Sequence, residues 1–195
     1  MNVKNCEYII GIDEVGRGPI AGPVTVGAVL LPNSYSWHDF KGLKDSKKLT
    51  KKDREVWFSQ VRGMGGISYK VSSVSEKVID KKGIVYSIRL AILRSLNKLD
   101  VNPKECLVLL DGGLCAPKKF VYQKTIIRGD EKEYSIALAS IMAKVTRDRK
   151  MVQLSKKYPE YGFDSHKGYG TKRHYEEIKK HGMCDIHRRS FFKGL

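Results

Sequence analysis

The chain has 195 residues, with 37 Lys and Arg against 21 Asp and Glu, which gives a formal charge of +16 at pH 7. This length suits one domain with a sizeable core, and it is too short for two ordinary domains. The charge indicates a polyanionic partner, either nucleic acid or an anionic membrane surface, whereas the absence of a spanning apolar run or a signal-peptide pattern argues for a cytoplasmic protein without a membrane span.

Residues 7–32 predict two buried strands joined by an acidic pair and a glycine-rich connection. An aspartate at the end of an apolar strand is held by a rigid element but points out of the core, where a catalytic or metal-binding carboxylate is well placed. Asp13 and Glu14 occupy this position. Adjacent strand side chains point to opposite faces, so we expect the chain to leave regular strand geometry near Glu14.

The connection that follows contains Gly16, Arg17 and Gly18. Glycines let the backbone approach a ligand closely, and an arginine fork can hold phosphate oxygens through two hydrogen bonds. A tight hairpin loop with a solvated arginine is the alternative. The neighbouring acidic pair favours a binding site.

A polar loop at residues 40–50 precedes a predicted helix. Thr50 and Asp53 have the spacing of a capping box, which predicts a helix over 51–61. The loop is rich in lysine: Lys44, Lys47 and Lys48. These lysines could bind anions ahead of a helix N-terminus or could simply be solvated. Residues 67–72 then predict a strand that extends the first two as a meander.

A helical pattern covers residues 75–99 and is interrupted near Gly83. Its apolar face contains Val85, Ile88, Ile92, Leu96 and Leu99. Residues 106–113 then predict a buried central strand that presents Asp111 at its tip, although an Asp-Gly hairpin turn would explain the same residues. Residues 120–130 predict another strand, with Asp130 as the third strand-end acid.

Residues 134–158 have the length and composition of one long helix. Its apolar face contains Leu138, Ile141, Val145 and Val152. Ser140, Lys144 and Arg147 share a second face, which would either line a phosphate track or be a solvated basic surface.

In the tail, Tyr169 lies between two glycines, which would expose its ring for stacking on a sugar or base, unless it is an ordinary turn residue. A last helix is predicted to follow Thr171 and to end at Gly182. The four cysteines lack zinc-like spacing with histidine, so we expect reduced thiols and no structural zinc.

Carboxylates at several strand ends would repel one another unless a cation neutralised them. A hard divalent cation, Mg²⁺ or Mn²⁺, suits oxygen ligands, and two such ions can promote phosphodiester hydrolysis. The pattern therefore favours a metal-dependent nuclease.

Several motifs resemble, in the same order, those of bacterial ribonuclease HII: GIDEVGRGPIAGP, DSKKLT, LLDGG, RGD with SIALASIMAKVTRD, and YGFDSHKGYGT with HRRSF. The resemblance implies an α/β RNase H-like fold, a mixed five-stranded sheet flanked by helices, in a single domain over 1–195. It also implies a small helical substrate-binding region from about 158 to 195. The implied activity is cleavage of the RNA strand of RNA–DNA hybrids and incision 5′ of single ribonucleotides in duplex DNA, leaving 3′-hydroxyl and 5′-phosphate ends, as in ribonucleotide excision repair.

The same resemblance implies residue roles. The metal-binding catalytic carboxylates would be Asp13, Glu14, Asp111 and Asp130, and the substrate-binding residues would be Gly16, Arg17, Gly18, Lys47, Lys144 and Tyr169. The glycine loop and Tyr169 would sense the ribose 2′-hydroxyl, and the lysines would contact phosphate. Gly113 stands where the family often has asparagine, which leaves that side chain's role unfilled.

Other features bear on the subfamily and on partners. The chain lacks the extra N-terminal domain expected of ribonuclease HIII, which favours HII. We expect a monomer, and SFFKGL at the C-terminus gives a sliding-clamp interaction only weak support. Two alternatives remain: an RNase H-like nuclease acting on DNA, such as a junction resolvase, and a basic nucleic-acid-binding module whose acids are structural.

Overall fold

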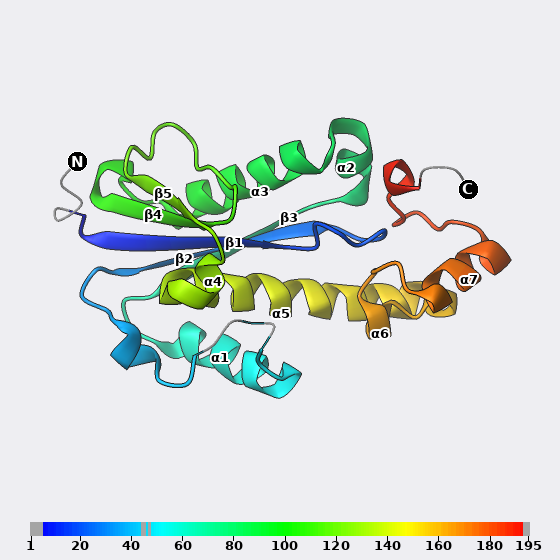
Figure 1. The fold of residues 1–195 in the computed structure, drawn as a ribbon, viewed down its shortest axis with the longest axis horizontal. Helices are drawn as coiled ribbons and strands as arrows, with labels where there is room; N and C mark the ends of the chain where they lie inside the picture. The colour runs from blue at the N-terminus through cyan, green and yellow to red at the C-terminus, as the bar shows by residue number, and fades with distance from the viewer. Residues whose placement is uncertain (1–5, 44–45, 47, 193–195) are drawn as a thin grey trace.

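The computed structural model describes residues 6–43, 46 and 48–192. Its strands form one mixed sheet in the order β3-β2-β1-β4-β5 (Figure 1). The strands are β1 (Tyr8–Val15), β2 (Val24–Pro32), β3 (Ser68–Val74), β4 (Cys106–Asp111) and β5 (Gln123–Ile126). The α-helices are α1 (Lys51–Gly63), α2 (Glu76–Lys82), α3 (Ile84–Leu99), α4 (Gly129–Lys132), α5 (Tyr134–Lys157), α6 (Phe163–His166) and α7 (Lys172–His181).

The sheet has the predicted mixed topology. β1, β2 and β3 form the expected antiparallel meander, and α2 and α3 then carry the chain back so that β4 lies parallel to β1. β5 is parallel to β4. Since β1, β4 and β5 run in one direction, their carboxyl ends lie at the same edge of the sheet. Residues that follow these strands are therefore brought together there.

Helices cover both faces of the sheet (Figure 1). α2 and α3 lie on one face and α5 on the other, and α1 packs against α5. β1 alternates between the two layers, because Ile10 and Ile12 join the α3 core whereas Ile9 joins the α5 core. Gly11 permits the closest approach: a Cβ there would lie 2.0 Å from the carbonyl carbon of Ser135. Glycine at this position therefore sets how closely α5 packs on β1.

The predicted helix signals are confirmed at most boundaries. Thr50 Oγ1 accepts from the Asp53 N–H at 3.1 Å at the start of α1. Gly83, with φ of 82°, divides α2 from α3. The prediction that Val85 belongs to the core is wrong, because its side chain is 52 % exposed and lines a small cavity beside Arg17. It lies about 60° around the helix from Ile88, at the margin of the apolar face.

Three local predictions at the sheet edge are corrected. The strand predicted over 120–130 is only β5, because Arg128 adopts a left-handed conformation with φ of 55° and turns the chain into α4. Asp130 therefore lies in a short helix and not at a strand end. Residues 106–113 contribute β4, an internal strand, although β1 is the middle one. β1 does not leave strand geometry at Glu14, since its pairing with β2 continues to Val15.

The segment after α5 has its own apolar cluster. The buried members are Ile20, Ala21, Met151, Tyr161, Phe163, Ile178 and Ile186. α7 begins after Thr171 and ends at Gly182, as predicted. Short 3₁₀ helices at Pro159–Tyr161 and Arg189–Phe191 flank α6 and α7. A substrate-binding role for this region stays a prediction.

The four cysteines are unpaired. Over the described ranges, no helix of the structure has the length and apolarity needed to span a bilayer.

Candidate active site

A cleft of about 350 Å³ lies at the carboxyl ends of β1 and β4. Its lining residues are Asp13, Glu14, Val15, Gly16, Arg17, Gly18, Ser46, Arg54, Asp111, Ser140, Lys144 and Tyr169. We call it the acidic cleft. It brings together all the predicted site residues except Asp130 and Lys47; Lys47 lies outside the described residues.

Asp13 and Glu14 reach the same cleft from opposite faces of β1. The pairing of β1 with β4 ends at Ile12, so the edge of β1 beyond that residue is open on this side. Side chains from both faces can therefore approach the opening around the free edge. Asp111, the last residue of β4, supplies the third carboxylate. A regular strand therefore brings both carboxylates to one cleft, and the departure from strand geometry that was expected near Glu14 is not needed.

The three carboxylates are electrostatically coupled. Asp13 is 6 % exposed, and its burial raises its pKa to about 8. A hydrogen bond from Ser140 lowers the pKa of Asp13, whereas Glu14 and Asp111 raise it. Burial also raises the pKa of Glu14, partly offset by Arg17, whose Nη1 lies 3.7 Å from Glu14 Oε1. The ionised cluster therefore needs an additional cation.

The donor set fits a hard divalent cation. Asp13 Oδ1 accepts from the Glu14 N–H at 2.7 Å, and Asp111 Oδ1 accepts from the Gly129 N–H at 2.7 Å. Backbone N–H groups thus hold both carboxylates in place, and oxygen ligands suit Mg²⁺ or Mn²⁺. Within the described residues, however, no three acidic, histidine or cysteine side chains already form a metal-binding group. The fit rests on the shared cleft and its charge.

Asp130 lies beside this cluster and is 3 % exposed. It follows Gly129, whose N–H bonds Asp111, so α4 holds it close to the end of β4. It is not among the described residues that line the acidic cleft.

The second face of α5 is only partly a cleft surface. Ser140 and Lys144 line the cleft; Ser140 Oγ lies 2.8 Å from Ser46 Oγ, and Lys144 pairs with Asp148 at 3.0 Å. The assignment of Arg147 to a phosphate track or solvated face was wrong, because Arg147 is fully buried and donates to backbone carbonyls. Periodicity cannot distinguish an arginine that faces solvent from one that faces buried carbonyls.

Arg54 is a cleft residue that no sequence pattern indicated. This residue lines the acidic cleft from α1, and its Nη1 donates to the carbonyls of Ser46 at 2.8 Å and Leu49 at 2.6 Å. It therefore holds the loop ahead of α1 against the cleft. No local pattern marks it, since it is one of many basic residues at a helix start.

Tyr169 is 45 % exposed, as predicted for a stacking residue. A Cβ at Gly18 would lie 4.0 Å from its Cε1, so the glycine loop and the aromatic ring are in contact range.

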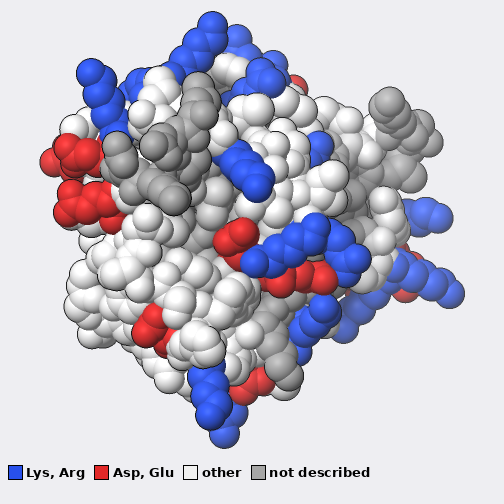
Figure 2. Space-filling view, turned by 60° about the vertical axis from the view of Figure 1, so that its left-hand side comes forward, with Lys and Arg blue, Asp and Glu red and all other residues white. Residues whose placement is uncertain are grey.

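Basic side chains elsewhere are dispersed: Figure 2 shows them spread over the visible face with acidic side chains among them. The positive charge is therefore not one compact patch on that face.

The chain resembles proteins of one family throughout. The family model described as Ribonuclease HII matches residues 10–193. Ribonuclease HII of Caldicellulosiruptor bescii is 46 % identical over 188 residues, which cover 96 % of this chain and 88 % of that protein.

Solved structures give the same result for the fold. RNase HII of Archaeoglobus fulgidus, solved in complex with PCNA, superposes with a TM-score of 0.78 at 25 % identity and covers 96 % of both chains. Bst-RNase HIII in complex with Mn²⁺ has a TM-score of 0.66 at 19 % identity, with coverage of 92 % of this chain and 64 % of that chain. The second likeness concerns the fold alone.

Proposed function

This chain belongs to the ribonuclease HII family and is a type 2 ribonuclease H, and we propose that it incises duplex DNA on the 5′ side of single embedded ribonucleotides, besides cutting the RNA strand of RNA–DNA hybrids. The observation that carries the proposal is the acidic cleft, in which three carboxylates lie beside the glycine loop and Tyr169. Products would carry 3′-hydroxyl and 5′-phosphate ends.

We propose that Asp13, Glu14 and Asp111 hold Mg²⁺ or Mn²⁺. We include Asp130 as a fourth acidic residue because α4 keeps it next to the hydrogen bond between Gly129 and Asp111. A bound divalent cation supplies Lewis-acid chemistry and a more acidic water. The Ser140 hydrogen bond and the Glu14 N–H orient Asp13 toward the opening.

The glycine loop and Tyr169 would select the sugar. The 2′-hydroxyl is the group that distinguishes RNA from DNA, and an aromatic ring next to exposed backbone can stack on the nucleotide that carries it. Gly18 and Tyr169 approach each other at one side of the cleft, which supports a shared role. Lys144, and Lys47 by family resemblance, would contact phosphate.

The test compares three substrates: a DNA duplex with one ribonucleotide, the same duplex in DNA only, and an RNA–DNA hybrid. Each is incubated with Mg²⁺, with Mn²⁺ or with chelator, and fragment ends are mapped. We expect metal-dependent cutting of the hybrid and of the first duplex, 5′ of the ribonucleotide, and an intact all-DNA duplex.

Asp111→Asn is the matched control for contaminating nuclease, since it keeps the size of the side chain and removes its charge. Equal cutting of both duplexes would instead indicate a DNA nuclease. Binding without cutting would indicate a non-catalytic module.

A further inference from the structure

Two arginines lie fully buried behind the glycine loop: Arg147 on α5 and Arg188 in the C-terminal segment. Neither forms an ion pair with a carboxylate in the part of the chain that the structure describes. Burying a cation without a counter-charge is expensive unless its hydrogen bonds are satisfied. Backbone carbonyls satisfy both guanidinium groups.

Arg188 is bonded directly to the glycine loop. Its Nη2 donates to the carbonyl of Gly16 at 2.6 Å, its Nη1 to that of Arg17 at 3.0 Å and its Nε to that of Gly22 at 2.9 Å. In a trans peptide the N–H of the next residue points opposite to the carbonyl. Fixing the carbonyls of Gly16 and Arg17 on the guanidinium therefore directs the N–H groups of Arg17 and Gly18 away from it. These residues border the acidic cleft, whereas Arg188 does not.

Arg147 supports the same loop from α5. Its Nε donates to Pro23 at 2.9 Å, its Nη1 to Lys167 at 3.0 Å and its Nη2 to Ala21 at 3.3 Å, all through carbonyls. It also packs under Gly16, where an added Cβ would lie 2.2 Å from Arg147 Nε.

A backbone connection joins the loop to the segment of Tyr169. The N–H groups of Ile20 and Ala21 both donate to the Gly168 carbonyl, at 2.9 and 3.2 Å. The glycine loop and Tyr169 are thus parts of one hydrogen-bonded unit.

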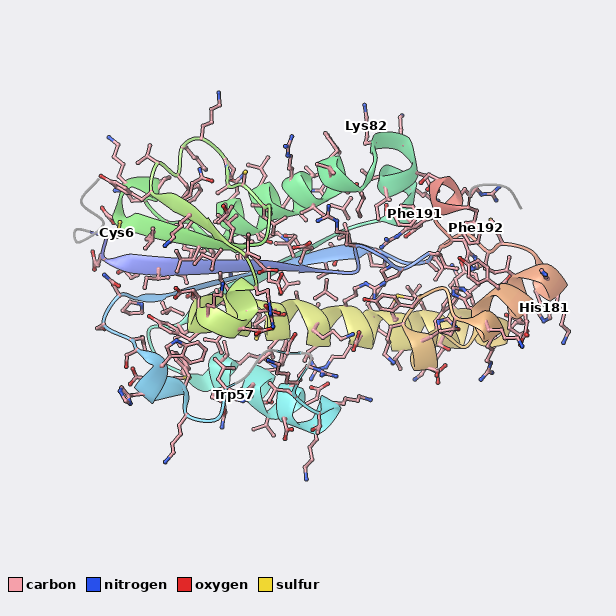
Figure 3. All side chains as sticks on the ribbon, in the orientation of Figure 1. Cys6, Trp57, Lys82, His181, Phe191 and Phe192 are labelled. Carbon is pink, nitrogen blue, oxygen red and sulfur yellow. The ribbon has the colours of Figure 1, made fainter. Side chains whose placement is uncertain are left out.

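The C-terminal segment is itself anchored. Figure 3 shows Phe191 and Phe192 at the α7 end of the molecule, near α2. The centre of the Phe191 ring lies 5.1 Å from Cζ of the Arg188 guanidinium. The ring packs against the core beneath α3 and against the apolar cluster that contains Phe163 and Ile186. The position of Arg188 is therefore determined by packing at two places.

We propose that Arg188 is a positioning residue for ribonucleotide recognition: it fixes the peptide planes of the Gly16-Arg17-Gly18 loop so that their N–H groups face the sugar beside Tyr169. This inference rests on the proposed function of the loop. Lysine cannot replace the arginine, because one ammonium does not reproduce a planar fork that reaches three carbonyls.

The test measures dissociation constants for two duplexes that differ only by one ribonucleotide, with Ca²⁺ as a hard cation. The variants are Arg188→Lys and Arg188→Met, with Arg189→Met as the control, since Arg189 is the exposed neighbour of the same charge. The preference is the ratio of the two dissociation constants, and we expect this ratio to fall about tenfold in both Arg188 variants. Arg189→Met should keep that preference. A loss of folded protein would weaken both affinities by the same factor and leave their ratio unchanged.

The outcomes separate the two proposals. A wild-type protein with no binding preference for the ribonucleotide would overturn the proposed sugar selection by the glycine loop and Tyr169, whereas a wild-type preference that survives in Arg188→Lys would overturn only the role of Arg188.

A second measurement needs no variant. Amide hydrogen exchange at Arg17 and Gly18 of the wild-type protein should slow more with the ribonucleotide duplex than with the all-DNA duplex, and equal protection would contradict the inference.

Discussion

Buried histidines beneath Tyr169 predict that the C-terminal region is acid-labile. His174 Nδ1 lies 2.8 Å from the Tyr169 carbonyl, which can only accept, so Nδ1 carries the proton. His174 Nε2 then accepts from His187 Nε2 at 3.0 Å, and His187 Nδ1 accepts from the Cys184 N–H at 2.9 Å. Both rings are neutral, and a further proton on either would break a hydrogen bond.

The magnitude follows from the pKa of His174, which burial lowers from 6.5 to about 4. Between these pH values the unfolded chain binds more protons at His174 than the folded chain does. The stability of the fold is therefore complete, as far as His174 is concerned, above pH 6.5 and is lost as the pH falls toward 4. For His174 alone the loss is about 2 kcal/mol between pH 7 and 5 and about 3 kcal/mol at pH 4. Burial also lowers the pKa of His187, which acts in the same direction.

The assay is urea unfolding at pH 5, 6 and 7, without metal, in an Asp13→Asn, Glu14→Gln double variant. The substitutions are needed because burial raises the pKa of both carboxyls, which has the opposite effect: their contribution to stability is lost as the pH rises, toward 8 for Asp13. We expect the free energy of unfolding to fall with acid, while NMR reports a neutral His174 at pH 5. A flat free energy over this range, or a measured His174 pKa near 6.5, would refute the reasoning.

Three further predictions concern the site and the fold. Asp111→Asn should lower hybrid cleavage at least about a thousandfold while binding, measured by fluorescence anisotropy, stays close to wild type; full turnover would reject the role of this carboxylate. Tyr169→Ala should reduce incision at a single ribonucleotide more than it weakens duplex binding, and equal losses in gel-based cleavage and binding assays would count against stacking. Gly11→Ala should cost about 3 kcal/mol of unfolding free energy, because its Cβ would meet the Ser135 backbone at 2.0 Å. Gly63→Ala, where nothing lies within 4 Å, should change the urea midpoint little.

Local patterns in the sequence determined the elements and most of the site. The apolar runs before Asp13 and Asp111 define strands of a sheet, and the Thr50 and Asp53 spacing defines the start of α1, because these signals act between near neighbours. The family motifs implied a mixed five-stranded sheet, and the structure supplied the strand order that brings Asp13 and Asp111 to one edge. The exposed ring of Tyr169 followed from its two glycines.

Only the tertiary structure decided which charged residues face the cleft and which are buried. Arg147 shares a helix face with Lys144, yet its guanidinium bonds carbonyls from distant segments, and Arg188 does the same behind the glycine loop. Asp130 lies in α4 and not at the end of a strand as expected. Glu14 reaches the cleft because the pairing of β1 with β4 ends at Ile12, before Glu14. The Asp130 outcome follows from the local turn at Arg128. The outcomes for the two arginines and Glu14 depend on which backbone groups arrive from far along the chain, and helical or strand periodicity contains no information about those partners.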